Sequence, residues 1–243
     1  MVDSTANALF QRHPLQRLSS PSRGLSALLH VLGLISFANS FYYLTVTKNP
    51  INDSYGWHFQ FLTIIGLTIS TASFAAGFLA DITLSRTLFL LKNSLSVCSA
   101  PMEVLISILY WGLRAIDPKL VVPEWAPKLP LSADMGFHAA PAILMVVDLL
   151  FFSPPWTIAA APAMALSSTI AGLYWLWVEK CYEQNKFYPY PIFDEVGHKG
   201  RIALFSGSAV VMALATILLK WLYGIVNGTA IANERPGKVK KTS

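Results

Sequence analysis

The sequence predicts an all-α, polytopic membrane protein in which six transmembrane helices surround an intramembrane cavity. The chain of 243 residues is 54% hydrophobic and only 13% charged, and its mean hydropathy is +0.50. A soluble domain would not bury so large an apolar fraction in one core. Six separate apolar runs are each near or above the ~20 residues that cross a ~30 Å hydrocarbon layer.

The apolar runs divide the chain into three parts. They cover residues 24–46, 59–80, 87–113, 134–152, 157–178 and 202–226. A polar, basic segment, 1–23, precedes a first run of about 22 residues, which is longer than the core of a signal peptide and is therefore predicted to stay as an anchor. We expect residues 24–226 to form the membrane domain and the basic tail 227–243 to be disordered.

The distribution of charge predicts the orientation. An even number of spans places both termini on one side of the membrane, and basic residues crowd both termini. Outside the spans, eight Lys and Arg residues fall on each side, but those on the side of the termini are denser and those opposite are mixed with acidic residues. The positive-inside tendency favours cytoplasmic termini that face anionic lipid rather than nucleic acid. The endoplasmic reticulum and the plasma membrane both fit.

The sequence predicts neither a cofactor nor a metal site. Its five histidines are scattered, and Cys98 and Cys181 lack the spacing of metal ligands. The G-x-S-x-G and H-E-x-x-H motifs of soluble hydrolases are missing as well. Any nucleophile must therefore be sought by its position in the spans.

The fourth run, 134–152, contains two ionisable residues in an otherwise apolar stretch, His138 and Asp148. Each costs about 2.5–3.5 kcal/mol to insert, so such residues usually face a protein interior or a water-filled cavity. Ten residues of straight helix separate them by roughly 15 Å. Asp148 is therefore expected to bind a neighbouring span or line the cavity, and not to touch His138.

A hydroxyl and an imidazole are predicted at similar depth. The second and fourth runs start from the same side of the membrane, with Thr63 and His138 each about one turn inside. Such a pair can act as nucleophile and general base if the side chains meet within ~3 Å. The alternatives are a threonine bonded to its own backbone and a satisfied buried imidazole. Asp134, one turn before His138, either orients the ring or stabilises the start of the helix as an N-cap or first-turn carboxylate.

Three further polar residues lie in or near the spans. Lys92 and Glu103 share one face of the third run but are ~16 Å apart along it. Lys92 is expected to extend to the interface, and Glu103 to meet a neighbouring span. His58, at the edge of the second run, is expected to be solvated.

Five short segments occur in order through the six runs. They are Ser54-Tyr55-Gly56, Phe59-Gln60-Phe61-Leu62-Thr63, Leu79-Ala80-Asp81, Gly136-Phe137-His138, and Phe187-Tyr188-Pro189-Tyr190-Pro191 with Asp194. Each segment is short, but their order and spacing together are specific. The sequence resembles the androgen-induced gene 1 family, which includes the androgen-dependent TFPI-regulating protein.

This resemblance implies a multipass hydrolase that cleaves fatty acid esters of hydroxy fatty acids with a threonine nucleophile and a histidine. On this sequence those roles fall on Thr63 and His138. Two features differ from the family pattern. An Asn-His-Gly-x segment precedes the histidine in the family, where this chain has Asp134-Met135-Gly136-Phe137, and Asp148 stands where the family has glutamate. The residue that orients His138 is therefore left open.

Two other functions also stay open. A carrier would use His138, Asp148 and Glu103 as an ion or proton relay, although the sequence shows neither the broken spans nor the inverted repeats typical of carriers. A non-catalytic adaptor would need these polar groups only for helix packing. The expected partners of a hydrolase are an amphiphilic lipid ester and membrane lipids. The sequence identifies no protein partner and no nucleic-acid site.

Overall fold

The protein is helical and contains no strand over the residues that the computed structural model describes, 12–123 and 126–228. The helices are α2 (Leu25–Val46), α3 (Leu62–Thr83), α4 (Arg86–Ile116), α5 (Leu131–His138), α6 (Ala140–Phe152), α7 (Ala160–Asn185), α8 (Ile192–Glu195) and α9 (Gly197–Asn227). Short 3₁₀ helices, η1 (Pro50–Asp53), η2 (Trp57–Gln60) and η3 (Pro118–Leu120), lie in the loops. The predicted all-α class is confirmed.

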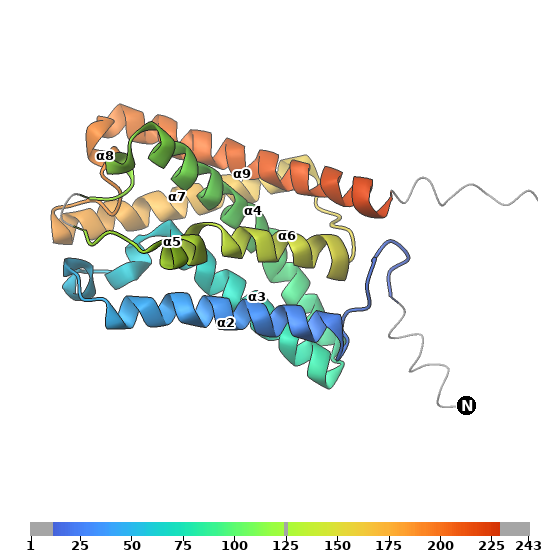
Figure 1. Ribbon diagram of the computed structural model, residues 1–243. Helices are drawn as coiled ribbons and strands as arrows, with labels where there is room; N and C mark the ends of the chain where they lie inside the picture. The colour runs from blue at the N-terminus through green and yellow to red at the C-terminus, as the bar shows by residue number, and fades with distance from the viewer. Residues whose placement is uncertain (1–11, 124–125, 229–243) are drawn as a thin grey trace, which may run out of the picture.

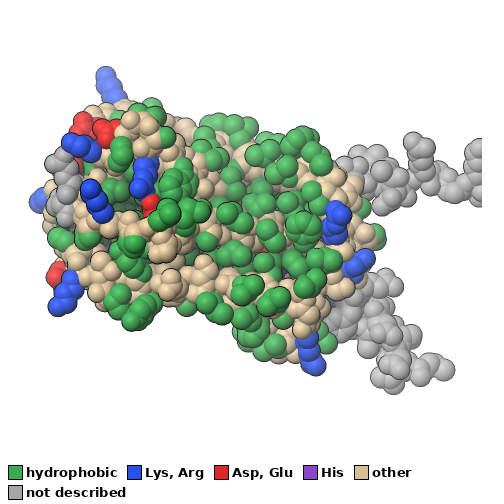
Figure 2. Space-filling model, viewed as in Figure 1, with side chains coloured by type: hydrophobic (Ala, Val, Ile, Leu, Met, Phe, Trp, Pro, Cys, Tyr) green, Lys and Arg blue, Asp and Glu red, His purple; other side chains and the backbone are tan. Residues whose placement is uncertain are grey.

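The long helices have the length and composition of membrane spans. Among the described residues, α2, α3, α4, α7 and α9 each qualify, and α5 and α6 qualify as a pair. Large apolar side chains point outward: Leu32 is 53% exposed, Leu176 70% and Ile225 62%. Figure 2 shows such side chains over the middle of the molecule, with Lys, Arg, Asp and Glu gathered toward the two ends. The protein is an integral, multi-pass membrane protein.

The fourth span is broken, whereas one continuous run was predicted. Helices α5 and α6 meet at an angle of 42°, with Ala139 between them at φ −131° and ψ −48°. Pro141 explains the break, because it has no N–H to donate to the carbonyl of Phe137 and its ring crowds that carbonyl. At the break, the carbonyl of His138, the last residue of α5, accepts a hydrogen bond from Nε1 of Trp111 at 3.2 Å.

The two ends of the bundle differ. Helix α2 begins and α9 ends at the same end, the termini end, and α8 lies at the opposite end, the loop end (Figure 1). At the termini end, Tyr223 donates to the carbonyl of Leu15 at 3.1 Å, and the N–H of Leu18 donates to Phe151 at 2.8 Å. The segment 12–23 thus packs on the bundle. Which membrane side each end faces stays a prediction, as do the domain boundaries.

The part of the predicted disordered tail beyond residue 228, with the basic residues at 235–241, lies outside the described residues.

Two apolar cores flank the position of the candidate site. One fills the space between α2, α3 and α6, where Phe37, Leu67, Phe74 and Met145 have no exposed surface. The other lies toward the loop end, where aromatic side chains of α7, α8 and α9 pack together, with Val178 fully buried among them. Residues of the start of α3 pack against both cores, which places this helix terminus at their junction.

Candidate functional site

Thr63 is the second residue of α3 and lies at the start of the span, not one turn inside it as predicted. Gly56 takes a left-handed conformation, φ +82°, and residues 57–60 then form the 3₁₀ turn η2. Phe61 is extended, at φ −91° and ψ 130°, so the α-helix begins only at Leu62. The first N–H groups of a helix have no partner within the helix and carry its positive end. The Thr63 hydroxyl therefore lies in a field that favours negative charge.

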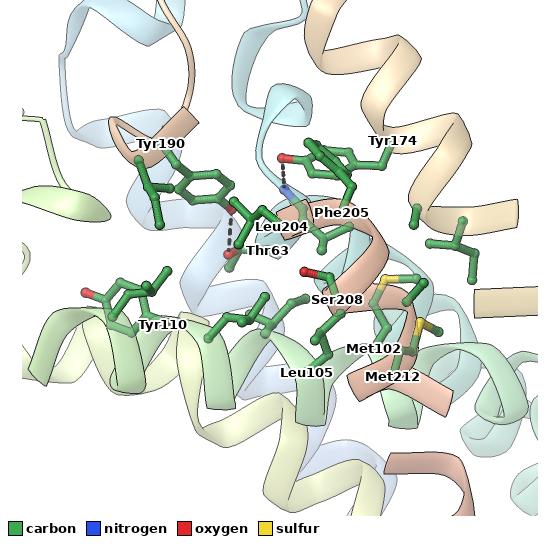
Figure 3. Close-up of a pocket in the computed structure, with 18 of the residues that line it drawn as sticks. Thr63, Met102, Leu105, Tyr110, Tyr174, Tyr190, Leu204, Phe205, Ser208 and Met212 are labelled. Atoms are coloured by element: carbon green, nitrogen blue, oxygen red, sulfur yellow. Dashed lines mark hydrogen bonds between the residues drawn. The ribbon is translucent and has the colours of Figure 1, made fainter. Parts of the chain in front are cut away.

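The Thr63 hydroxyl lies next to a phenol. Its Oγ1 is 3.4 Å from the hydroxyl of Tyr190, and either group can donate. The Tyr190 hydroxyl also interacts with the backbone of Leu62 and Thr63, and burial raises the pKa of this phenol. Tyr174 completes the arrangement, because its hydroxyl accepts from the N–H of Leu62 at 3.1 Å and donates to the carbonyl of Gln60 at 3.0 Å. Figure 3 shows both tyrosines at the start of α3.

Tyr190 belongs to a segment that carries the family resemblance, and no role for it was predicted from the sequence. The signal that could have found it is its position in the Tyr-Pro-Tyr-Pro run. Proline rigidifies the chain on both sides of this tyrosine. A rigid aromatic residue in a loop on the Thr63 side of the membrane is a candidate wall of the site.

His138 is the last residue of α5 and lies directly before the break in the span. The imidazole stacks on Tyr110 with ring centroids 3.4 Å apart and planes within 5°, and the residue is 8% exposed. Its Nδ1 lies 3.0 Å from Oδ1 of Asp134. A carboxylate accepts hydrogen bonds, so Nδ1 carries the proton and Nε2 is left as an acceptor. Within the described residues, Nε2 forms no hydrogen bond.

Asp134 lies in the first turn of α5, where no side chain caps the helix, and its carboxylate contacts His138. Its carboxylate is 1% exposed and also accepts from Nη1 of Arg114. The same Nη1 donates to the hydroxyl of Tyr110 at 2.7 Å. Arg114 was not singled out from the sequence, because Arg at the end of a span is usual at a membrane interface. Here Arg114 binds the Asp134 carboxylate, which in turn binds the imidazole of His138.

Thr63 and His138 line one cavity, which we call the histidine cavity. Its volume is about 140 Å³, and Leu44, Val122 and His58 also contribute to its wall. Both catalytic candidates face this space, so no helix separates them. They do not hydrogen-bond each other in the structure. Catalytic hydrogen bonds are often long without substrate and tighten when it binds.

A second cavity, the methionine cavity, also reaches Thr63. It has a volume of about 90 Å³ and extends between α3, α4, α7 and α9, with Leu105, Phe205 and the two methionines Met102 and Met212 in its wall. A water molecule needs only ~10–15 Å³, so either cavity has room for more than water.

Asp148 lies at the termini end and does not contact His138. Its Oδ2 is 2.7 Å from Nζ of Lys92, and its Oδ1 is 3.2 Å from Nε2 of His30. The His30 Nδ1 is in turn 2.6 Å from Asp81. Lys92 has no exposed surface, so the prediction that it extends to the interface was wrong. Asp148 and Ser153 accept hydrogen bonds from Nζ of Lys92 inside the bundle. The ammonium group is therefore paired within the protein and does not extend to the membrane interface.

Glu103 is also separate from the two catalytic candidates. It is 1% exposed and accepts a hydrogen bond from Ser70 of α3 at 2.9 Å. Gly66 makes this position possible, because a Cβ there would lie 2.9 Å from Oε1 of Glu103. Glu103 lines neither cavity, and the structure places His138, Asp148 and Glu103 in three different polar groups.

His58 is buried, contrary to the prediction of a solvated side chain. It is 4% exposed, and its Nε2 lies 3.0 Å from Oδ1 of Asn52. The turns η1 and η2 fold over the ring and remove it from solvent, and this burial lowers its pKa to about 4. The wall of the histidine cavity is therefore polar but uncharged at His58 at neutral pH.

Comparison with known proteins identifies the family. The model of the FAR-17a/AIG1-like protein family matches residues 25–224. A UPF0641 membrane protein of Schizosaccharomyces pombe is 35% identical over 206 residues, 84% of this chain and 92% of the relative. The androgen-induced gene 1 protein of Homo sapiens is 20% identical over 201 residues, 76% of this chain and 84% of the relative. No solved structure matches. The chain, with its six-span pattern and its family match from α2 to α9, belongs to the FAR-17a/AIG1-like family.

Proposed function

We propose that the protein hydrolyses carboxylic esters of amphiphilic lipids inside the membrane, with Thr63 as nucleophile and His138 as general base. One observation carries this proposal: Thr63 and His138 line the same cavity. The contact of Asp134 with Nδ1 of that histidine supports it. The bound Nδ1 leaves Nε2 free to take a proton. The resemblance to the androgen-induced gene 1 family supplies the substrate class, fatty acid esters of hydroxy fatty acids.

The proposed reaction is acyl transfer in two steps. His138 Nε2 takes the Thr63 proton, and the alkoxide attacks the ester carbonyl carbon. The tetrahedral intermediate expels the alcohol oxygen, which takes the proton from His138, and the acyl group stays on Thr63. His138 then deprotonates a water molecule that attacks the acyl-threonine. The free fatty acid leaves and the Thr63 hydroxyl is restored.

The start of α3 and Tyr190 are suited to stabilise the negative oxygen of the intermediate. The first-turn N–H groups of α3 carry the positive end of the helix, and the hydroxyl of Tyr190 is 3.4 Å from Oγ1 of Thr63. A donor positioned in this way stabilises developing charge in a site that excludes water. Tyr190 completes a candidate site of four residues with Thr63, His138 and Asp134.

Hydrolysis by the purified full chain in detergent tests the proposal. The substrate is the hexadecanoyl ester of a hydroxyoctadecanoic acid. Thr63→Ala and His138→Ala are each expected to lower kcat by about 10³-fold or more. Thr68→Ala is the matched control, because Thr68 lies on the same helix and donates only to its own backbone, at 2.7 Å to Ile64. Full activity in folded Thr63→Ala would refute the nucleophile, and the absence of hydrolysis in the folded wild type would favour the adaptor.

One observation favours a carrier as the second candidate. The fourth span is broken at Ala139, and broken spans in carriers often mark a binding site. Against a relay through His138, Asp148 and Glu103, each of these residues has its own partners. Proton uptake into proteoliposomes that contain the protein and a pH-sensitive dye would distinguish a carrier. A flux that persists in Thr63→Ala and stops in His138→Ala would favour it.

We also propose an endoplasmic reticulum or plasma membrane location with both termini cytoplasmic, on the charge distribution of the sequence. Protease protection of an N-terminal tag in sealed microsomes tests the orientation. A tag that is cleaved from the cytoplasmic side supports it, and a protected tag contradicts it.

A further inference from the structure

The two cavities meet at Thr63. Four residues line both of them: Thr63, Tyr110, Val121 and Tyr190. An ester bound with its carbonyl at Thr63 therefore has two directions open to its two chains. The position of the histidine decides between these directions, because His138 lines only the histidine cavity.

We infer that the fatty acyl chain occupies the methionine cavity and the alcohol arm occupies the histidine cavity, and that Met102 and Met212 set the acyl chain length. This inference rests on the proposed hydrolase function and assigns its two substrate arms. During acylation the leaving alcohol oxygen must receive the proton that His138 took from Thr63. The alcohol arm must therefore extend on the side of His138, and the acyl chain on the other side of Thr63.

The walls of the two cavities agree with this assignment. Away from Thr63, the methionine cavity is walled mostly by aliphatic, aromatic and thioether side chains, with two serines, Ser167 and Ser208. The hydroxyl of Ser167 donates to its own backbone at 2.9 Å. Such a wall suits an uncharged hydrocarbon chain. The histidine cavity has Thr47, Asn49 and His58 in its wall near the loop end. These side chains suit an arm that carries a second polar group, as a hydroxy fatty acid does.

The two methionines are placed to end the acyl site. In Figure 3, Ser208 lies between Thr63 and the sulfur atoms of Met102 and Met212. Met102, from α4, is 1% exposed, and Met212, from α9, is 2% exposed. A flexible, polarisable thioether fills the end of an apolar site and adapts to the chain that enters it. A larger side chain at either position, or at Ser208, shortens the space available to the chain.

Labelling of the wild-type full chain tests the assignment without requiring turnover. The probe is a non-hydrolysable ether analogue of the ester with a diazirine at the end of one arm, and labelled peptides are identified by mass spectrometry. With the diazirine on the acyl-type arm, we expect label on Met102, Phe205 or Met212. With the diazirine on the alcohol arm, we expect label on Leu44 or Val122. Excess analogue without diazirine should remove both signals.

The outcomes separate the inference from the proposed function. Reversed labelling, both arms in one cavity, or no competable label would overturn the inference. The expected labelling in a protein that hydrolyses no ester would support the two-arm site and refute the hydrolase instead.

Kinetics of chain-length variants provide a second test. Ser208→Phe and Met212→Trp are expected to lower kcat/KM for hexadecanoyl esters by about tenfold or more, and to leave butanoyl esters of the same alcohol near the wild-type value. Changing the alcohol arm at constant acyl length should leave the ratio of variant to wild-type kcat/KM unchanged. Leu214→Phe is the matched control, because Leu214 lies on the same helix, is 55% exposed and points outward. An equal loss for short and long acyl chains would overturn the length assignment.

Discussion

The Nδ1 atom of His138 lies 3.0 Å from the Asp134 carboxylate, one turn earlier on the same short helix. This contact selects the tautomer in which Nε2 can accept a proton. In Asp134→Asn the side-chain amide can donate to Nδ1 and stabilise the opposite tautomer. We expect kcat to fall by about 10²–10⁴-fold with little change in KM, measured on the hexadecanoyl ester.

The control for this variant is Asp117→Asn. Asp117 accepts from the N–H of Lys119 at 2.9 Å beyond the end of α4 and lines neither cavity. Wild-type kcat in Asp134→Asn, at matched unfolding temperature, would show that Asp134 has no role in orienting the base.

Removal of the phenol oxygen at position 190 should slow the chemical step. Tyr190→Phe keeps the ring and removes the hydroxyl that lies 3.4 Å from Thr63. We expect a loss in kcat of about 10–10³-fold, as for other donors to a developing oxyanion. Tyr188→Phe is the control, since the Tyr188 hydroxyl donates to Glu179 at 3.0 Å. Equal kinetics in the two variants would exclude Tyr190 as a donor.

The buried pair of Lys92 and Asp148 should be important for stability. Lys92→Met removes the cation 2.7 Å from the carboxylate and leaves Asp148, which has no exposed surface, with His30 as its remaining ionisable neighbour. Removal of one partner of a buried pair costs about 3–5 kcal/mol. Denaturant unfolding in detergent measures the loss, and adding Asp148→Asn to Lys92→Met should recover part of it.

Lys180→Met provides the comparison for that measurement. Lys180 pairs with Glu183 at 2.9 Å on an exposed part of α7, and exposed pairs contribute little to stability. Equal losses in Lys92→Met and Lys180→Met would contradict a special role for the buried pair.

The stability of the loop end should fall in acid through His58. Burial lowers the pKa of His58 from 6.5 to about 4. Between these values the unfolded chain binds a proton at this position and the folded protein does not. The contribution of His58 to stability is therefore complete above pH 6.5 and is lost as the pH falls toward about 4. Over this pH range we expect the unfolding temperature of the wild type to fall by roughly 5 °C more than that of His58→Gln.

His198→Gln is the control for the pH series, because His198 is exposed at the start of α9. Parallel pH curves for wild type and His58→Gln would exclude His58 as the source of the acid sensitivity.

The predicted spans agree closely with the helices because the membrane imposes a local rule. A segment that crosses hydrocarbon must satisfy its own backbone hydrogen bonds, so length and apolar composition suffice to locate it. The first predicted run, 24–46, corresponds to α2 at Leu25–Val46, and the last, 202–226, lies within α9 at Gly197–Asn227. Pro141 was the local signal for the break in the fourth span, and its effect was missed.

The sequence by itself determined the helical class, the approximate spans and the family, since these follow from composition, spacing and short motifs. It also predicts the pair Thr63 and His138, and their catalytic role stays a prediction. Tertiary structure decided the rest. The partner of a buried charge depends on which spans pack together, so Lys92 with Asp148 and Asp134 with Arg114 could not be derived from helical spacing. A cavity is the space that several helices leave between them. The packing of α3, α4, α7 and α9 leaves the methionine cavity on one side of Thr63, and residues of α2, α3, α4 and α5 line the histidine cavity on the other.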